Sequence, residues 1–490
     1  MISIDVLPDD VLLEIFYFSL DGASDEAYSI NSKELVERWQ SLVHVCRRWR
    51  SIVFVSPRRL NLRLRCTPTT LARDTLEVWP TLPLAIYSHG EYRSNSTASI
   101  DNITAVLERN DCVCQITLLW LTSSQLGKVS AAMRVPFPEL THLELHTYRM
   151  VPVLPDSFLG GYAPRLERLQ LEGIPLPSLP TLLLSATHLV DLCLIRIPRS
   201  GYVSPVAMVT VLSTLTCLRS LLLEFHLFRP DLASRRPPSS ARSVLPVLAC
   251  FIFNGVGEYL DDIVARIDAP RLKLLSIKLF NQNLLDAPQF VQFVGRTSGL
   301  RGFKKARVCF GIYDATINLY TQASGYGELF VTFGRKELDW QVSSLKQVCT
   351  SCLPLLYTLE DLYIFKSQYL QPHWQDHIEN TLWLELLQPF AAVKNLHLCG
   401  EFAPRIVPAL QELVGSRATE VLPTLQNIFL EELQPSGPVK EGIEQFVATR
   451  EVASHPITVS RWETSQRDKA PRPRSLPTWG SRRVVVNTMY

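Results

Sequence analysis

A spacing of apolar residues, Leu-x-x-Leu-x-Leu with apolar substitutions, recurs along this chain and limits the folds it can adopt. Seven matches start 23 to 30 residues apart: Val113-Ile116-Leu118, Leu140-Leu143-Leu145, Leu166-Leu169-Leu171, Leu189-Leu192-Leu194, Leu218-Leu221-Leu223, Leu248-Phe251-Phe253 and Leu272-Leu275-Ile277. Three more follow at wider steps: Leu359-Leu362-Ile364, Val393-Leu396-Leu398 and Leu425-Ile428-Leu430. Side chains alternate across a strand, so the last two apolar residues of each match point the same way. Each match therefore predicts a short strand with one buried face.

Such units become stable by stacking, because one strand cannot bury its own apolar face and a neighbouring repeat completes the core. The period resembles that of leucine-rich repeats, which is roughly 20–29 residues. The Asn that regular leucine-rich repeats carry after the strand is missing, which predicts an irregular solenoid. The expected fold class is α/β (α+β repeats), with helices such as residues 205–217 on the convex side.

The regular spacing is interrupted once and is absent at both ends. Residues 301–345 contain three short strand-like segments with Gly-containing turns, which predicts a small β-rich insertion. Residues 57–110 are interpreted as a connecting segment, 111–300 as the leucine-rich-repeat-like solenoid and 346–450 as further irregular repeats. Residues 229–243 are rich in Pro, Ser and Arg and predict a loop. Residues 459–490 are basic and carry three prolines, which predicts a disordered tail.

The first expected helix is apolar around most of its circumference. Eight of the ten residues from Val11 to Leu20 are apolar, and Pro8 with two following carboxylates favours a helix start just before them. A second helical stretch over residues 34–54 places its apolar residues at spacings of three and four. Two short helices leave much apolar surface uncovered, so a partner is expected on the first helix.

These two stretches resemble an F-box motif, which has Leu-Pro at the start of its first helix and a Val-Cys-Arg-x-Trp core in its last. The resemblance covers about residues 4–54, within an F-box-like helical motif assigned to residues 1–56, and with the degenerate repeats it extends to the large fungal F-box-like family. It implies that this motif binds a Skp1-like adaptor and joins a cullin-RING ubiquitin ligase. The implied adaptor-binding residues are Leu7, Pro8, Leu12, Ile15, Phe16, Leu42, Val45, Cys46 and Trp49. The alternative is an N-terminal hairpin docked on the rest of the chain, and the loop 21–34 is longer than in the shortest family members.

A second set of candidate residues comes from the strands. In a leucine-rich solenoid, the strand residues between the inward ones line the concave face, and a mixture of charges and aromatic rings there suits protein recognition. The predicted target-binding residues are His142, Glu144, His146, Arg168, Gln170, Glu172, Asp361, Tyr363, Phe365, Asn427, Phe429 and Glu431. The loop 229–243 adds Arg235 and Arg236, which would favour an acidic or phosphorylated target segment.

Composition argues against several functions. A net charge of +2 over 490 residues provides no field that attracts nucleic acid or a membrane surface. No apolar run reaches the roughly 20 residues of a membrane span, and the acidic start does not resemble a secretory signal. Eleven scattered cysteines suit reduced thiols. We expect a cytoplasmic or nuclear protein without nucleic-acid or membrane partners.

Motifs for catalysis or metal binding are weak. Cys349 and Cys352, followed by His373 and His377, are of the types that bind zinc. The gap between the two pairs exceeds that of the compact finger, so the cysteines are interpreted as packing residues. Nucleophile-elbow, phosphate-loop and kinase signatures are missing from the sequence. We therefore expect no catalytic residue, metal or cofactor.

The sequence thus predicts a substrate-receptor subunit of an SCF-type (Skp1-cullin-F-box) ubiquitin ligase, which binds the adaptor through the F-box and a target protein through the solenoid. Two alternatives stay open. One is a scaffold of the same architecture that never presents a target for ubiquitination. The other is an enzyme site in residues 300–450 that shows no motif.

Overall fold

The computed structural model describes most of the chain, in two compact units that meet in sequence between Tyr202 and Val203. The described residues are 6–21, 38–57, 60, 62–68, 82–89, 97–147, 152–226, 242–280, 287–321, 327–334, 336–351, 353–367, 378–431 and 436–462. Most of the loop 229–243 and of the tail after residue 462 lies outside these ranges, as do Arg235 and Arg236.

Three helices open the first unit: α1 (Asp9–Asp21), α2 (Arg38–Val45) and α3 (Arg47–Val55). The sequence predicts one helix where α2 and α3 lie, and that prediction is wrong. Cys46 has extended backbone angles (φ −156°, ψ 170°), and its Sγ accepts a hydrogen bond from the backbone N–H of Trp49 at 3.5 Å. A side chain that caps a helix N-terminus in this way ends the preceding helix.

The rest of the first unit is a parallel sheet in chain order. Its strands are β1 (Leu64–Cys66), β2 (Leu84–His89), β3 (Val113–Leu121), β4 (His142–Thr147), β5 (Arg168–Glu172) and β6 (Asp191–Ile197). The sheet therefore begins well before residue 111. Leu62, Leu64 and Cys66 alternate as buried residues, a period-two pattern that a search for the Leu-x-x-Leu-x-Leu spacing does not detect.

The second unit continues the same construction. Its sheet has the order β7 (Ser220–Phe225), β9 (Cys250–Gly255), β11 (Leu274–Phe280), β14 (Glu328–Gly334), β13 (Asp314–Thr321), β12 (Phe303–Phe310), β15 (Asp361–Lys366), β16 (Asn395–Leu398), β17 (Asn427–Leu430) and β18 (Thr458–Arg461). A separate pair joins β8 (Ser243–Val244) and β10 (Ile267–Asp268). Because β18 includes Val459 and Arg461, the prediction of a disordered tail from residue 459 is wrong at its start.

The segment predicted as a small insertion forms three strands of this sheet. From β11 the chain passes to β12, returns antiparallel through β13, and reaches β14 beside β11. Helix α11 (Leu338–Ser351) then leads to β15, which pairs with β12 in parallel. Only β13 runs against the others, so the repeats on both sides keep one strand direction.

The core is a continuous row of apolar residues within each unit, set by strand register. In the first unit, Ile116, Leu143, Leu169 and Leu192 are successive partners. In the second, the row that starts at Leu221 passes through all ten strands, antiparallel β13 included: Leu221, Phe251, Leu275, Leu329, Leu319, Ala306, Leu362, Leu396, Ile428 and Val459. From Leu221 to Ile428 every member is fully buried, which confirms that the repeat spacing marks stacked strands.

A pair of backbone hydrogen bonds to one carbonyl fixes this register at the start of several strands. The carbonyl of Glu360 accepts hydrogen bonds from the N–H groups of Lys394 (2.9 Å) and Asn395 (3.0 Å), and the carbonyl of Lys394 does the same for Gln426 and Asn427 at 2.8 and 2.9 Å. Equivalent bonds join Lys273 and Leu274 to the carbonyl of Ala249. A one-residue slip would break these bonds and turn every apolar side chain to the other face.

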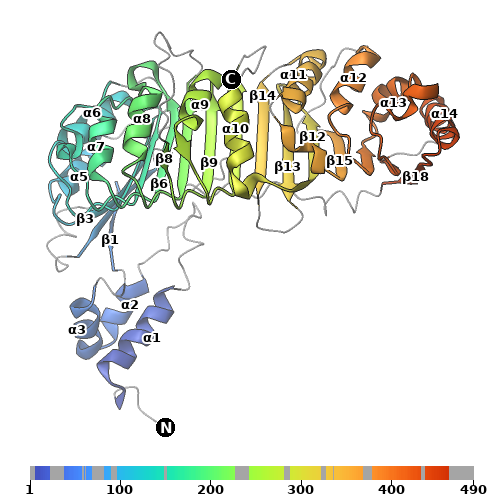
Figure 1. Ribbon diagram of the computed structural model, residues 1–490. Coiled ribbons are helices and arrows are strands. Elements are labelled where there is room, and N and C mark those ends of the chain that lie inside the picture. Colours follow the sequence, from blue (N-terminus) through green and yellow to red (C-terminus); the bar gives the residue numbers. More distant parts are fainter. Residues whose placement is uncertain are drawn as a thin grey trace. The chain divides into compact units, whose positions relative to one another are not determined.

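Helices cover one face of each sheet (Figure 1), and no helix of the described residues covers the other face, here called the open face. The covering α-helices are α5 (Thr97–Leu107), α6 (Ser123–Ala132) and α7 (Leu179–Ser185) in the first unit, and α8 (Pro205–Leu212), α9 (Gly257–Val264), α10 (Pro288–Arg296), α11, α12 (Asn380–Leu387), α13 (Ala403–Gln411) and α14 (Pro438–Val452) in the second. Short 3-10 turns at 158–161, 199–201, 298–300, 354–358 and 415–419 replace or extend them.

Arg450 on α14 is a fully buried charged residue that holds the last repeats together. Its guanidinium donates to the carbonyls of Ala418 (2.9 Å), Leu422 (3.1 Å) and Pro423 (3.3 Å), and burial lowers its pKa. Leu422 has φ +50°, a left-handed conformation that non-glycine residues rarely adopt. The buried guanidinium therefore adds a donor to the carbonyls around this turn, of which that of Leu422 also accepts from the N–H of Leu425 at 3.1 Å.

We predict that Arg450→Met lowers the free energy of unfolding by about 2 kcal/mol or more, because several buried carbonyls lose their donor. Arg417→Met is the matched control, since Arg417 is an exposed arginine that pairs with Glu420, and its effect should stay within about 0.5 kcal/mol. Urea denaturation followed by circular dichroism measures both. Equal stability of the two variants would contradict the role given to Arg450.

Candidate interaction surfaces

Helix α1 has two apolar faces, and only one of them is covered. Leu12, Leu13 and Phe16 are buried, and the Phe16 ring lies 4.7 Å from that of Trp49 on α3. Val11, Ile15 and Phe18 follow each other at steps of four and three, so they share one helical face. That face is open to solvent, with Ile15 42% and Phe18 71% exposed.

The predicted adaptor-binding residues differ in solvent exposure: some are buried, some half-buried and some exposed. Leu12 and Phe16 are buried by the chain's own residues, and their contact with an adaptor stays a prediction. Ile15, Val45 and Pro8 are exposed, whereas four others are half-buried: Leu7, Leu42, Cys46 and Trp49. Arg48 ties α3 to the start of α1 through Asp9 at 2.6 Å. The exposed strip, which we define as Val11, Ile15 and Phe18 of α1, is thus presented by a packed group of helices.

The open face of the first unit carries a polar cluster that we define as Glu144, His146, Gln170, Glu172 and Arg196. The two ring nitrogens of His146 lie 3.1 Å from a carboxylate oxygen of Glu144 and 3.2 Å from one of Glu172. Gln170 contacts the same ring at 2.8 Å, and Arg196 pairs with Glu172 at 2.9 Å. The sequence predicted all of these residues except Arg196, which has φ +50° and lies at the irregular end of β6.

A row of polar groups lies beside this cluster at the strand starts. His142, Arg168 and Asp191 are register partners, and Arg168 pairs with Asp191 at 3.1 Å. Burial, with the positive charges of Arg168 and Arg63, lowers the pKa of His142 to about 4. His142 is therefore neutral at physiological pH and contributes no charge to this surface.

The open face of the second unit carries a stack of rings that we define as the aromatic ladder: Tyr363, His397 and Phe429. Parallel pairing aligns them. The rings of Tyr363 and His397 lie 4.1 Å apart at 11°, and those of His397 and Phe429 lie 4.4 Å apart at 9°. Beside the ladder, the guanidinium of Arg307 lies 4.5 Å from the ring of Phe365.

Two residues near the ladder were missed by sequence reasoning. Trp462, which follows β18, places its ring 5.4 Å from that of His397 and 5.8 Å from that of Tyr363. His397 lies between the two inward residues of its own repeat, so the rule that selected Tyr363 and Phe429 also selects it. Trp462 was assigned to the tail and carries no such signal.

Burial sets the protonation of the ladder. His397 is 8% exposed, and desolvation with the nearby charge of Lys305 lowers its pKa to about 4. Desolvation and the carboxylate of Asp361 raise the pKa of Tyr363 to about 12. Both rings are therefore uncharged near neutral pH. The Nδ1 atom of His397 has no hydrogen-bond partner among the described residues.

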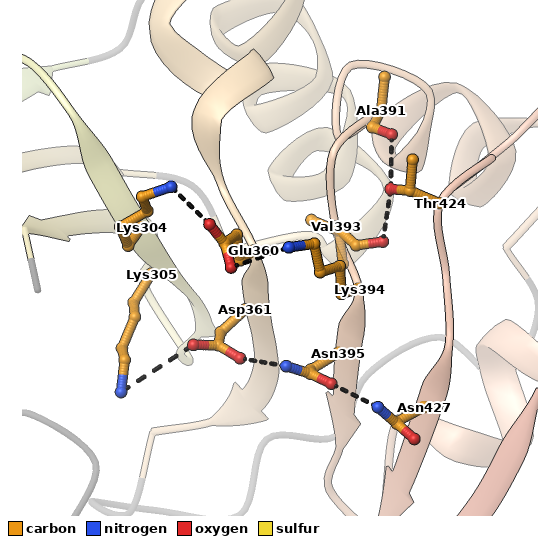
Figure 2. Close-up of polar contacts among 10 residues, drawn as sticks. All are labelled: Lys304, Lys305, Glu360, Asp361, Ala391, Val393, Lys394, Asn395, Thr424 and Asn427. Atoms are coloured by element: carbon orange, nitrogen blue, oxygen red, sulfur yellow. Dashed lines mark hydrogen bonds and ion pairs between the residues drawn. The ribbon is translucent and has the colours of Figure 1, made fainter.

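A polar ladder of Asp361, Asn395 and Asn427 lies two residues before the aromatic ladder on the same three strands. Figure 2 shows its contacts. Asn427 donates to Asn395 at 2.8 Å, and Asn395 donates to Asp361 at 2.7 Å. Lys305 completes the row at 4.0 Å from Asp361. Asp361 and Asn427 were predicted for this face, whereas Asn395 was not. The three side chains hydrogen-bond to one another, and these bonds hold the starts of the three strands at a fixed spacing.

Glu360 links the same strands on their other side (Figure 2). Its carboxylate pairs with Lys304 and, at 3.2 Å, with Lys394, and hydrogen bonds from both lysines lower its pKa. Thr424 donates to the carbonyls of Ala391 (2.9 Å) and Val393 (3.1 Å). The two ion pairs of Glu360 are more than a third exposed and add little stability individually.

Several sequence-derived candidates fall outside the described residues. They include Arg235, Arg236, Cys352, His373 and His377, so the zinc-like spacing has only Cys349 in the described part, buried on α11. Over the part of the chain that the structure describes, His, Cys, Asp and Glu form no group of three suited to a metal ion. Within the same residues, every helix is too short or too polar to cross a membrane.

Comparison with known proteins gives little further constraint. No family model matches the chain, and no curated protein matches its sequence. Among solved structures, the leucine-rich repeat-containing protein LegL7 from Legionella pneumophila aligns with 12% identity and a TM-score of 0.24, over 79% of this chain and 97% of that one. The fold described above rests on strand register and burial, and not on this likeness.

We predict that His397→Phe weakens the loss of stability in acid. The unfolded imidazole has a pKa near 6.5 and the folded one about 4, so between these values the unfolded chain binds a proton that the folded chain does not. Stability from this group is full above pH 6.5 and falls by at most about 3 kcal/mol on the way to pH 4. Phenylalanine keeps the stack and removes this contribution.

Urea denaturation near pH 7 and near pH 4.5 measures the effect. His455→Phe, at an exposed position, serves as the matched control and should keep the wild-type difference. If His397→Phe loses as much stability in acid as the wild type, the burial argument for this histidine is wrong.

Proposed function

We propose that this chain is a substrate receptor that binds a Skp1-like adaptor of a cullin-RING ubiquitin ligase through its N-terminal helices and holds a target protein on the open face. The observation that carries this proposal is the exposed strip on α1. A packed group of helices leaves Val11, Ile15 and Phe18 uncovered on one helical face, and large exposed apolar surfaces of this kind mark partner sites. The resemblance to an F-box motif is the reason for proposing a Skp1-like adaptor as that partner.

The polar and aromatic character of the open face supports target capture. The first unit offers ionic groups, the second offers rings, and both sets are held by strand pairing at fixed separations. Aromatic and arginine side chains supply most of the binding energy at protein interfaces. The receptor itself does no bond chemistry; it raises the concentration of target lysines near the conjugating enzyme.

We predict that replacing both Ile15 and Phe18 with Asp abolishes co-purification of a purified fungal Skp1, because two carboxylates would be buried in the apolar interface. Affinity should fall by more than about a hundredfold. Helical content and thermal unfolding should stay at wild-type values, since both side chains are exposed. The control is Val452→Asp, which adds one such carboxylate at an exposed valine on α14.

Retained adaptor binding in the double variant would refute the F-box assignment. Phe16→Asp is unsuitable for this test, because Phe16 is 1% exposed and packs on Trp49. Its replacement would unfold the helices and remove binding whatever the partner is.

The scaffold alternative differs from a receptor only in the fate of the bound protein. We predict that a protein captured by the intact chain has a shorter half-life in cells than the same protein beside the Ile15/Phe18 double variant, because only the intact chain brings it to the ligase. A cycloheximide chase with quantitative immunoblotting measures both half-lives. Equal half-lives with equal capture would favour the scaffold.

A further inference from the structure

Trp462, the last described residue, packs its ring against the aromatic ladder of its own chain. Trp462 is 4% exposed, and its backbone N–H donates to the carbonyl of Leu430 at 2.6 Å. Its ring lies across those of Tyr363 and His397 at 57° and 67°. An aromatic side chain that leaves the last strand thus turns back over the open face.

The strand that precedes Trp462 is the last strand of the described sheet. β18 has four residues, its side chains are exposed or half-buried, and β17 is its pairing partner at the end of the sheet. Edge strands of this kind are readily replaced by an extended segment of another chain. Ser460 is the register partner of Phe429, so β18 brings no ring of its own to the next place in the stack, and Trp462 supplies the contact instead.

We propose that the aromatic ladder is a binding site for an aromatic side chain on an extended segment of a partner, and that Trp462 is its internal occupant, which the partner displaces. This inference rests on the proposed use of the open face for target capture and specifies the target: an extended segment that ends in an aromatic residue, as Thr458–Trp462 does with the sequence Thr-Val-Ser-Arg-Trp. The partner would add beside β17 as β18 does, with its ring on the ladder.

The chemistry of the ladder supports this partner. Its rings are uncharged at neutral pH, so stacking an incoming ring requires no charge to be desolvated. The buried Nδ1 of His397, which lacks a described partner, is a place for one hydrogen bond from the incoming segment. Stacked and edge-on ring pairs contribute about 0.5–1.5 kcal/mol each beyond burial, which suits an exchangeable contact.

The test uses the full chain and a fluorescein-labelled peptide with the sequence of residues 457–462, ITVSRW. Fluorescence anisotropy should detect binding to the Trp462→Ala chain and at least about tenfold weaker binding to the wild type, because a tethered occupant competes at an effective concentration in the millimolar range. The same peptide with its tryptophan replaced by alanine should bind the variant at least about tenfold more weakly, since it lacks the ring.

A second substitution locates the site. Adding Phe429→Ala to Trp462→Ala should remove peptide binding, while Tyr357→Ala, at an exposed ring outside the ladder, should leave it unchanged. The proposal would be overturned if the peptide bound the wild type and the Trp462→Ala chain equally well. It would also be overturned if Phe429→Ala left the affinity of the Trp462→Ala chain unchanged. The absence of binding to a folded Trp462→Ala chain would overturn it as well.

Folding is checked by circular dichroism for each variant. If Trp462→Ala unfolds the chain, Trp462→Leu keeps apolar bulk without the ring and takes its place in the same measurements. Unfolding of both would show that Trp462 is a structural plug and would overturn the proposal. No adaptor or ligase takes part, so a failure of the F-box assignment and a failure of this inference give different results.

Discussion

Register between neighbouring strands is the constraint on which the rest of the structure depends. Each strand contributes apolar residues to a buried row, and the row is continuous within each unit because the partners are fixed by strand pairing. A slip of one residue would expose every member of the row. The segment β12–β14 keeps the same register. Its residues Ala306, Leu319 and Leu329 continue the buried row, although β13 runs antiparallel.

The same register organises the surface. When alternate residues are fixed inward, the residues between them face outward in aligned rows, which places Tyr363, His397 and Phe429 in one stack and Asp361, Asn395 and Asn427 in another. These side chains contact each other across strands, so the surface is held in place before any partner arrives. A preorganised surface loses less conformational entropy on binding, which is the physical advantage of presenting recognition residues on strands.

The sequence predicts the repeats well because burial has a regular spacing, and it predicts irregular features poorly. The buried strand residues Leu143, Leu169 and Leu396 follow from the Leu-x-x-Leu-x-Leu pattern. The helix break at Cys46 depends on a sulfur cap, and Trp462 reaches the ladder through tertiary packing, so neither has a local signal. On α1 the pattern shows too many apolar residues for one face, but only the fold shows that Phe16 is covered and Phe18 is not. The order of β12, β13 and β14 is likewise a property of the sheet.

The central claim is that the exposed strip on α1 is an apolar interface for an adaptor, and calorimetry tests it most directly. Titration of the full chain with a purified fungal Skp1 at several temperatures gives both affinity and heat-capacity change. The account predicts binding at a one-to-one ratio with a negative heat-capacity change, the marker of apolar burial. No binding, or binding with a heat-capacity change near zero, would contradict it.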